Sequence, residues 1–526
     1  MAAPVYSTDL TDITLCESTT GFSALGGGGA GLGAGVDFAI QGTNAVDKQV
    51  TNALKGMVYD AGSPITLGAD DHIFIWEVCA TPGITEPKSL GGVRVTIGTA
   101  TNAYYEWYVN GSDTLPEGGM RNYAVYYTGT TADNQVGSPG ASPQVFGGQA
   151  DVNATSKGVN FALDAMRYGT GFYITQGDAT TPITFSGSAA ENDAKSNRYG
   201  ILAKIPGGYS LKGKYVIGQT NAGTPTAAYF VDNNTSVALT DTEDFCLSDF
   251  TEIIFDHPST YFSLSTVIFT AIGTINRGKF LVNDASTTGS IVGCTFTGID
   301  QTVLNTNVQV TGSSWTGCNA VIQSGSIIYD SSFLATTDPS GSLISNDPSL
   351  ISYNTFEGDG THHGIEVIAA GTYNFTGNTF TGFVSGSNGG EELLFNPPGG
   401  TGDLTINVLG GGSNLNYRNL SSGTVTINNN IQITLTGMKD FTEVRVLDVS
   451  NPADPVELAG IENVVSASVG ANNNSFAFSL AAATLVDIAI ISVDYVNQRI
   501  SDYTIPSTDA TIPVQQSFDR NYTNPV

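Results

Sequence analysis

The sequence predicts an all-β protein with three folded parts: an N-terminal β-sandwich of jelly-roll or lectin-like type, a central right-handed parallel β-helix, and a C-terminal immunoglobulin-like β-sandwich. Three observations lead to this fold class. The composition is rich in turn residues, with 63 glycines and only 13% charged residues, and no long stretch has a helical hydrophobic period. A five-residue unit recurs through the middle of the chain. Short β-rich runs separated by turn residues lie on both sides of it.

The length of the chain indicates several domains, because 526 residues exceed what a single hydrophobic core usually organises. We expect an N-terminal segment over residues 1–45, a sandwich over 46–194, the β-helix over 195–430 and the second sandwich over 431–526. The second sandwich would cap the solenoid, whose open end would otherwise expose unpaired strand edges.

The N-terminal sandwich is predicted from short strand-like runs that follow one another about every 10 to 15 residues. These runs are His72–Val78, Gly92–Gly98, Ala103–Val109 and Tyr123–Tyr127. The segment Val159–Tyr168 instead predicts a short helix, because three of its apolar side chains can share one helical face and Gly169 follows where helices often end. Asp164 and Arg167 would then pair at positions i and i+3.

The recurring unit of the central part is a small polar residue, Ser or Thr, an aromatic, any residue, and then Gly or Ala. It occurs at Cys294–Gly298, Ser313–Gly317, Ser331–Ala335, Asn354–Gly358 and Asn378–Gly382, with successive aromatics 19, 18, 23 and 24 residues apart. A repeat of about 20 residues made of β-forming residues and turn residues is a solenoid pattern. We expect each repeat to be one coil, with the aromatics stacked in a ladder inside.

The C-terminal part contains six short apolar runs separated by turns rich in Asn and Pro. They are Ile431–Leu435, Glu443–Val449, Asn463–Ala467, Ser475–Leu480, Val486–Val493 and Arg499–Ile505. Six strands in about 90 residues are typical of an immunoglobulin-like sandwich.

The charge of the chain excludes one class of function. It has 48 acidic and 19 basic residues, a formal net charge of −29. Such a surface repels phosphate backbones, and no basic patch interleaved with aromatics occurs, so nucleic-acid binding is not expected. The five cysteines are scattered without C-x-x-C spacing, which argues against a disulfide framework or a zinc site.

The chain start lacks the basic and apolar segments of a signal peptide, and no apolar run is long enough to span a membrane. We therefore expect synthesis in a reducing cytoplasm and no membrane insertion. No cofactor is expected either.

Four aromatics in one predicted strand form a candidate glycan-binding surface: Tyr104, Tyr105, Trp107 and Tyr108. Aromatic faces offer flat apolar area on which a sugar ring can stack. Because successive side chains of a strand point to opposite faces, half of these rings must point into a core instead.

The densest group of acids and histidines lies between Glu357 and Glu366. Glu357, Asp359 and Glu366 are candidate acid/base residues for glycoside hydrolysis, which needs two carboxylates. His362 and His363 are candidate metal ligands beside them. The alternative is a glycine-rich turn that carries solvated polar groups. Lyase chemistry is disfavoured, because no Lys or Arg occurs between Lys279 and Arg418.

Several stretches resemble structural proteins of tailed bacteriophages, in particular marine phages. They are Met1–Ser7, Asp37–Lys48, Asp164–Thr170 and Ile512–Tyr522. This resemblance implies a virion protein of the tail-fibre, tailspike or capsid-appendage kind. It brings no catalytic residues, and it implies other virion proteins as partners and a homo-oligomer, a trimer by analogy with phage spikes.

Three functions follow as hypotheses. The first is a non-enzymatic virion structural protein, a tail fibre, spike or surface appendage that contacts host-surface glycans. The second is a glycan-degrading tailspike, a hydrolase that uses Glu357 and Asp359. The third is a capsid decoration or tail component present in many copies.

Overall fold

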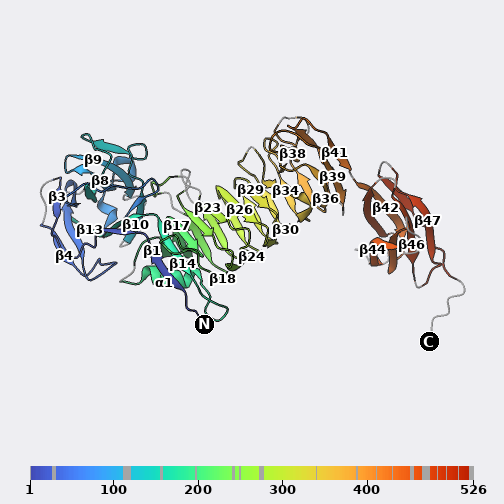
Figure 1. Ribbon diagram of the computed structural model, residues 1–526, viewed down its shortest axis with the longest axis horizontal. Coiled ribbons are helices and arrows are strands. Elements are labelled where there is room, and N and C mark those ends of the chain that lie inside the picture. The colour runs from blue at the N-terminus through green and yellow to red at the C-terminus, as the bar shows by residue number, and fades with distance from the viewer. Residues whose placement is uncertain are drawn as a thin grey trace. The chain divides into compact units, whose positions relative to one another are not determined.

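The computed structural model is almost entirely β, with 54% of the described residues in strands (Figure 1). It describes residues 2–26, 31–110, 120–153, 158–195, 198–239, 243–247, 250–271, 278–338, 340–384, 386, 389–409, 412–428, 430–449, 455–464, 474–481, 484–492, 494–506 and 509–519. The described residues contain one α-helix, α1 (Phe185–Asp193), and three short 3₁₀ helices, at Pro82–Ile84, Lys88–Leu90 and Pro348–Leu350. The chain divides into two compact units, Met1–Ile322 and Gln323–Val526.

The first unit begins with two antiparallel sheets. Their strands are β2 (Thr11–Thr14), β3 (Phe22–Leu25), β4 (Gly33–Gly35), β5 (Ala45–Thr51), β6 (Ala53–Asp60), β7 (His72–Cys79), β8 (Val93–Ala100), β9 (Ala103–Asn110), β10 (Met120–Val125), β11 (Asn134–Val136), β12 (Val145–Val152) and β13 (Gly158–Gly169). Sheet 1 has the order β10-β7-β13-β5-β4, with β2 also paired to β13, and sheet 2 has the order β11-β9-β8-β12-β6-β3. The four predicted strands between residues 72 and 127 are confirmed as β7 to β10.

The core of this region lies between the two sheets. Ile75 and Tyr123 come from sheet 1, and Val95, Trp107 and Phe146 come from sheet 2, all fully or almost fully buried. Each lies at an alternate position of its strand, as expected when one face of a sheet packs on a core. The outer face of sheet 1 is then left to receive other parts of the unit.

The helix expected over Val159–Tyr168 is wrong, because this segment is the central strand β13. It pairs with β5, β2 and β7, and its side chains are buried on both faces, so no strand alternation is visible in the sequence. A bulge between Asp164 and Arg167 breaks the alternation further. The predicted pair is also wrong. The Asp164 carboxylate accepts two backbone N–H groups from Ile40 and Gln41, and Arg167 pairs with Asp12 instead.

The real helix, α1, was not predicted. Its N-cap is Thr184, whose hydroxyl accepts a hydrogen bond from the Gly187 N–H at 2.8 Å. The sequence Phe185–Asp193 contains glycine and several small polar residues, which are weak helix formers. Packing of Phe185 and Ala189 in the interior holds the helix in place.

The neutral form of His72, at the start of β7, is held by its hydrogen bonds. Its Nδ1–H donates to the carbonyl oxygen of Asp70 at 3.0 Å, and its Nε2 accepts the N–H of Leu247 at 3.3 Å. The ring is buried and stacked on Phe250. Burial lowers the pKa of His72 to about 3 and outweighs the opposing effect of Asp70. A second ring proton would face the Leu247 N–H, which explains the preference for the neutral form.

The rest of the first unit is a stack of coils in which the chain visits three sheets in rotation. The strands are β1 (Val5–Thr8), β14 (Gly171–Thr175), β15 (Leu202–Ile205), β16 (Gly208–Leu211), β17 (Lys214–Ile217), β18 (Tyr229–Asn233), β19 (Ser236–Leu239), β20 (Glu252–Phe255), β21 (Tyr261–Ser265), β22 (Ile268–Ala271), β23 (Lys279–Val282), β24 (Thr288–Val292), β25 (Thr295–Thr297), β26 (Gln301–Asn305), β27 (Val308–Thr311), β28 (Ser314–Thr316) and β29 (Val321–Ser324), which contains the boundary. The sheet orders are β14-β17-β20-β23-β26, β16-β19-β22-β25-β28 and β18-β21-β24-β27, all with parallel pairing. Parallel pairing begins at β14, before residue 195.

The second unit continues this pattern in its own coils and ends in two antiparallel-rich sheets. Its coil strands are β30 (Ile327–Tyr329), β31 (Ser332–Leu334), β32 (Leu343–Ser345), β33 (Ile351–Ser352), β34 (Thr355–Glu357), β35 (Ile365–Val367), β36 (Gly371–Thr376), β37 (Thr379–Thr381), β38 (Leu393–Phe395), β39 (Leu404–Leu409), β40 (Tyr417–Asn419) and β41 (Val425–Asn428). They form the parallel orders β30-β33, β31-β34-β37, β32-β35-β38-β40 and β36-β39-β41.

The predicted stacking of the aromatics is confirmed inside each unit. Phe296 and Trp315 stack with ring centroids 4.8 Å apart and planes 1° apart. Phe356 stacks on Phe333 at 4.9 Å and on Phe380 at 4.8 Å. These spacings equal the distance of about 4.8 Å between neighbouring strands, because each aromatic is in register with the aromatic of the next coil.

The last part of the second unit has its own core. Its strands are β42 (Asn430–Met438), β43 (Thr442–Asp448), β44 (Val456–Val464), β45 (Asn474–Ala481), β46 (Leu485–Ile491), β47 (Gln498–Thr504) and β48 (Ala510–Pro513). One sheet has the order β45-β42-β48 and the other β44-β43-β46-β47, and residues such as Leu435, Val446 and Ile488 are buried between them. Five of the six predicted runs are strands; of Asn463–Ala467, residues 465–467 lie outside the described residues.

Two further observations concern the cysteines and possible membrane-spanning helices. All five cysteines are buried, and none of them forms a disulfide bond. In the part of the chain that the structure describes, no helix is long and apolar enough to cross a membrane.

Candidate functional site

The four candidate aromatics of β9 do not form one exposed surface. Trp107 is fully buried in the core, and Tyr105 lies on the same face of the strand in contact with that core. Tyr104 and Tyr108 lie on the opposite face. Tyr104 is only 8% exposed, and the guanidinium of Arg94 lies over the Tyr108 ring at 4.7 Å.

The polar neighbours of these rings are engaged with one another. Arg94 pairs with Glu106 at 3.0 Å, and the Glu106 carboxylate also accepts hydrogen bonds from Gln149 at 2.9 Å and Asn134 at 2.7 Å. Arg94, Glu106 and Gln149 are all at most 5% exposed. This network satisfies its own charged groups, so the arrangement stabilises sheet 2 and offers little to a ligand.

The segment from Glu357 to His362 is an exposed turn. Glu357 is exposed at the end of β34. The Asp359 carboxylate accepts a hydrogen bond from Thr361 at 2.7 Å and lies 2.9 Å from the His362 ring. Burial would raise the pKa of Asp359, but the hydrogen bonds from Thr361 and His362 outweigh it and lower that pKa. Asp359 is therefore an ionised carboxylate that organises the turn.

His363 and Glu366 lie in a different environment from the exposed turn, because both are buried. The His363 ring is 3.2 Å from the backbone oxygen of Glu391 and 3.5 Å from its carboxylate, and burial lowers the pKa of His363. Glu366 accepts a hydrogen bond from Asn396 at 2.8 Å. Within the described ranges, no three His, Cys, Asp or Glu side chains are placed to hold a metal ion.

A third candidate site is a pocket in the first unit. We call it the Trp76 pocket; its volume is about 260 Å³. It is lined by Ile40, Trp76, Arg121, Asn122, Asp193, Arg198, Ala203, Lys204, Ile205, Ser210 and Lys212. The volume is near the lower end of the range of about 300–1,000 Å³ for small-molecule sites, so it fits a small ligand or one ring of a larger one.

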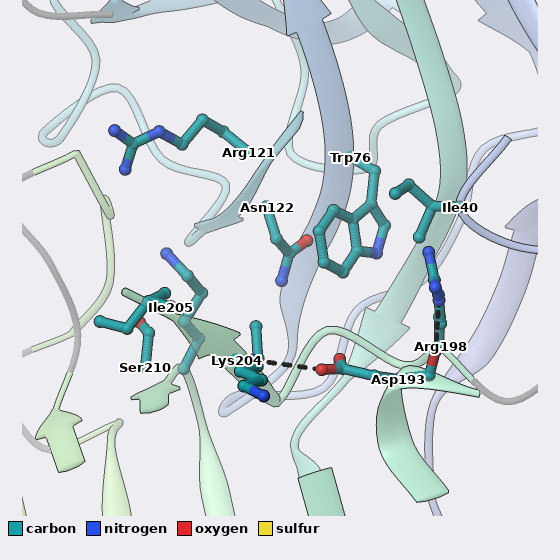
Figure 2. A pocket seen from close by; sticks show the side chains of 11 residues that line it. Ile40, Trp76, Arg121, Asn122, Asp193, Arg198, Lys204, Ile205 and Ser210 are labelled. Atoms are coloured by element: carbon teal, nitrogen blue, oxygen red, sulfur yellow. Dashed lines mark hydrogen bonds between the residues drawn. The ribbon is translucent and has the colours of Figure 1, made fainter. Parts of the chain in front are cut away.

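One wall of the pocket is the outer face of sheet 1. Trp76 on β7 and Asn122 on β10 are direct cross-strand partners, so their side chains lie beside each other on that face. Figure 2 shows the indole and the amide together, across from Asp193 and Lys204. The indole packs on Ala203 and Ile40 within a small apolar cluster.

The other wall is the hairpin formed by β15 and β16. Ala203 and Ser210 are paired across it, and both line the pocket. The two-residue connection is Pro206-Gly207, and Gly207 has φ +87°, which a residue with a Cβ rarely adopts. The sequence therefore fixes a tight turn that presents this hairpin to sheet 1.

The segment that leads into the hairpin approaches sheet 1 closely at Gly200. The Asn122 amide donates a hydrogen bond to the Gly200 carbonyl oxygen at 2.6 Å. A Cβ at Gly200 would lie 2.4 Å from the Asn122 side-chain nitrogen, and the residue has φ +89°. Only glycine allows this contact without a shift of the backbone.

The pocket is basic in an acidic protein. Four of the 19 basic residues of the chain line it, together with one acid. One of the four is neutralised: the buried Lys212 ammonium lies 2.8 Å from both oxygens of Asp244. Arg198 and Lys204 lie near Asp193, and both act electrostatically on its carboxylate.

Asp193 organises the basic side of the pocket. Its carboxylate accepts the backbone N–H of Lys204 at 3.2 Å, and its backbone oxygen accepts a hydrogen bond from Nε of Arg198 (Figure 2). Burial raises the pKa of Asp193, and the Lys204 hydrogen bond and the neighbouring cations only partly oppose this.

Three buried polar atoms that line the pocket have no hydrogen-bond partner among the described residues. They are Nε1 of Trp76, Oδ1 of Asn122 and Oγ of Ser210. Each side chain is at most 7% exposed. An unsatisfied buried polar group costs about 1–3 kcal/mol, so three in one pocket indicate a surface made to bind a polar molecule.

The comparisons with known proteins give no family. No protein-family model matches the chain, and no curated protein matches it. Among solved structures, the family 11 carbohydrate-binding module from Clostridium thermocellum in complex with a β-1,3-1,4-mixed-linked tetrasaccharide has 11% identity and a TM-score of 0.21, over 32% of this chain and 96% of that one. An exo-β-agarase has 10% identity and a TM-score of 0.23, over 34% and 26%. The Agl-KA catalytic domain has 10% identity and a TM-score of 0.18, over 80% and 100%. TM-scores this low support no inference about this chain.

Sequence reasoning missed the Trp76 pocket, because its residues come from segments up to 172 positions apart and none carries a motif. One signal was present. Arg198, Lys204, Lys212 and Lys214 follow one another within 17 residues of a chain that has only 19 basic residues. In an acidic chain, a local cluster of basic residues indicates a candidate binding site.

Proposed function

We propose that this chain is a non-enzymatic structural protein of a phage virion, a tail fibre, tailspike or surface appendage, that contacts host-surface glycans through the Trp76 pocket. The observation that carries the glycan part is the combination, in one small pocket, of a buried indole with three hydrogen-bonding atoms that have no partner within the described ranges. A binding site for a sugar ring needs both an apolar surface and groups that form hydrogen bonds with the hydroxyls.

The same proposal covers the architecture. In this proposal, strands β2 to β13 make up the N-terminal sandwich, strands β14 to β41 a right-handed parallel β-helix, and strands β42 to β48 an immunoglobulin-like sandwich. The rotation of the chain through parallel sheets supports the second assignment, and the two-sheet core around Leu435 and Val446 supports the third. The virion assignment rests on the four stretches that resemble phage structural proteins.

A glycan array with the purified full chain tests the glycan part. We expect binding that falls at least about tenfold in Trp76→Ala, because truncation of a buried aromatic contact removes more than 1.4 kcal/mol. Trp76→Phe keeps one aromatic ring and removes the five-membered ring of the indole with its N–H, and it separates loss of binding from loss of folding. Tyr329→Ala is the matched control, since Tyr329 is 44% exposed and lies outside the pocket. Unchanged binding in both Trp76 variants would refute the assignment of the pocket.

Electron microscopy of intact virions tests the location. A few copies of the chain at the tail, as homotrimers with one end free, are the expected result. Hundreds of copies over the shell would replace the fibre or spike role with a capsid decoration role. Absence of the chain from virions would refute the virion proposal.

A further inference from the structure

The sandwich at the C-terminal end of the second unit has an edge strand that is exposed on both faces. Strand β44 (Val456–Val464) stands at the end of the sheet order β44-β43-β46-β47, and among the described strands only β43 pairs with it. From Val456 to Glu462 every residue is exposed except Ala459, which is half-buried. An edge strand presents a row of backbone N–H and C=O groups to which another chain can add a strand.

The inner face of β44 receives less cover than the rest of its sheet. Ala459 and Ile461 are cross-strand partners of Val446 and Val444, which are fully buried in the core, so their side chains point to the same inner face. Ile461 is nevertheless 37% exposed. The facing sheet has only three strands, in the order β45-β42-β48. A four-stranded sheet therefore packs on a three-stranded one, and β44 is left partly uncovered.

A groove of about 520 Å³ opens between the edge strands of the two sheets. Its apolar lining includes Leu458 and Ala459 from β44 and Phe476, Phe478 and Leu480 from β45. Phe478 belongs to the buried core, and the half-buried Ala459, Phe476 and Leu480 pack against that core. We call this space the β44 groove. Because it reaches the hydrophobic core of the sandwich, apolar side chains that enter it are removed from water, which favours binding.

The outer face of the same strand is acidic. Arg445 lies on β43 between two buried core residues, so its side chain points outward, and it forms an ion pair with Glu443. Glu457 and Glu462 of β44 line the same surface. The hydrogen bond from Glu443 raises the pKa of Arg445 most, and the charges of Glu457 and Glu462 raise it further. Three carboxylates around one guanidinium make this surface locally negative.

The two faces together define the chemistry of a strand that pairs with β44. Successive side chains of a strand point to opposite faces of its sheet. One set of side chains therefore enters the apolar groove, and the other set lies beside Glu457 and Glu462. A second copy of this chain fits poorly, because each copy has a formal net charge of −29 and pairing of two β44 strands brings the glutamates of both together.

We infer that β44 receives an extended segment of another protein in which apolar residues alternate with lysine or arginine. The segment pairs with the backbone of β44, inserts its apolar side chains into the β44 groove and places its basic side chains beside Glu457 and Glu462. Glycan binding by the Trp76 pocket, which lies in the first unit, is not required for this contact.

Calorimetric titration of the full chain with synthetic peptides tests the inference. The first peptide has nine residues, the length of β44, and valine alternates with lysine along it. Two matched peptides carry serine or glutamate in place of lysine, and a fourth has the same valines and lysines in two separate blocks. The alternating lysine peptide should bind at least about tenfold more tightly than the glutamate peptide and about fivefold more tightly than the block peptide. Its binding should also slow hydrogen exchange in residues 456–462, because backbone N–H groups of β44 become paired.

Variants of β44 locate the effect. Glu457→Gln combined with Glu462→Gln should weaken binding of the lysine peptide about fivefold and leave the serine peptide unaffected. Leu458→Ser, a change of an exposed side chain that lines the groove, should weaken both peptides. Asp502→Asn is the matched control, because Asp502 is exposed on β47, the opposite edge of the same sheet. It should change affinity by less than about twofold.

Each alternative gives a different result. Equal binding of the lysine and glutamate peptides, or binding of none of the peptides, would overturn the inference. Equal binding of the block peptide, with no slower exchange in residues 456–462, would show attraction by net charge alone and would overturn strand addition. If the wild-type chain forms oligomers that Leu458→Ser separates into monomers, a second copy occupies β44 and the inference is wrong.

Discussion

Replacement of Phe356 by Ala should destabilise its coil more than any surface change nearby. Phe356 is fully buried and stacks on two rings, Phe333 at 4.9 Å and Phe380 at 4.8 Å. Truncation of a buried Phe to Ala costs about 3–5 kcal/mol. Because two stacked pairs are lost and each contributes about 0.5–1.5 kcal/mol beyond burial, we expect a value near the upper end of that range.

Hydrogen exchange measured by mass spectrometry is the appropriate assay, because it gives the local free energy of opening for peptides from the coil. Tyr353→Ala is the matched control: the residue is an aromatic in the same coil and is 49% exposed. It should change the opening free energy by less than about 1 kcal/mol. The reasoning would be refuted if Phe356→Ala had an effect as small as that of Tyr353→Ala, since the ladder would then not stabilise the coils.

Three further predictions concern charge. His72 has a folded pKa of about 3, below its unfolded value of about 6.5, so its contribution is complete above pH 6.5 and is lost as the pH falls toward 3. The resulting decrease in the free energy of unfolding is about 5 kcal/mol for the wild type. Urea unfolding measured as a function of pH should show a smaller decrease for His72→Gln. Asp244→Ala removes the carboxylate that pairs with the buried Lys212 ammonium and should lower the free energy of unfolding by about 3–5 kcal/mol, while an unchanged urea midpoint would contradict a structural role for the pair. The wild type and the variants Glu357→Gln and Asp359→Asn should all leave the length of a polysaccharide substrate unchanged. Release of reducing ends by the wild type, abolished in either variant, would restore the hydrolase hypothesis.

The coils were predictable because they depend on local repetition. A small polar residue, an aromatic and a glycine at nearly constant spacing leave few alternatives, and Phe296, Trp315 and Phe356 occupy the interior positions that the repeat predicts. The strand β13 was mistaken for a helix because it is buried on both faces and bulged, which removes the two-residue period on which strand prediction depends.

The pocket was not predictable in the same way, because it is a product of tertiary contacts. Trp76 and Asn122 become neighbours only through the pairing of β7 with β10, and the hairpin with Ser210 reaches them through the glycine at position 200. The aromatics of β9 carried a stronger sequence signal, but the sheet places Trp107 in the core. The sequence shows which residues are aromatic, whereas the register of the paired strands decides which of these side chains face a cavity.

Ligand footprinting by hydrogen exchange tests the central claim most directly, since it compares all three candidate regions in one experiment. With the tightest-binding saccharide present, we predict protection of residues 74–78, 120–123 and 202–211, which surround the Trp76 pocket. No change is expected in β9 or in residues 357–366. Protection of either of those regions, with none around the Trp76 pocket, would contradict the account.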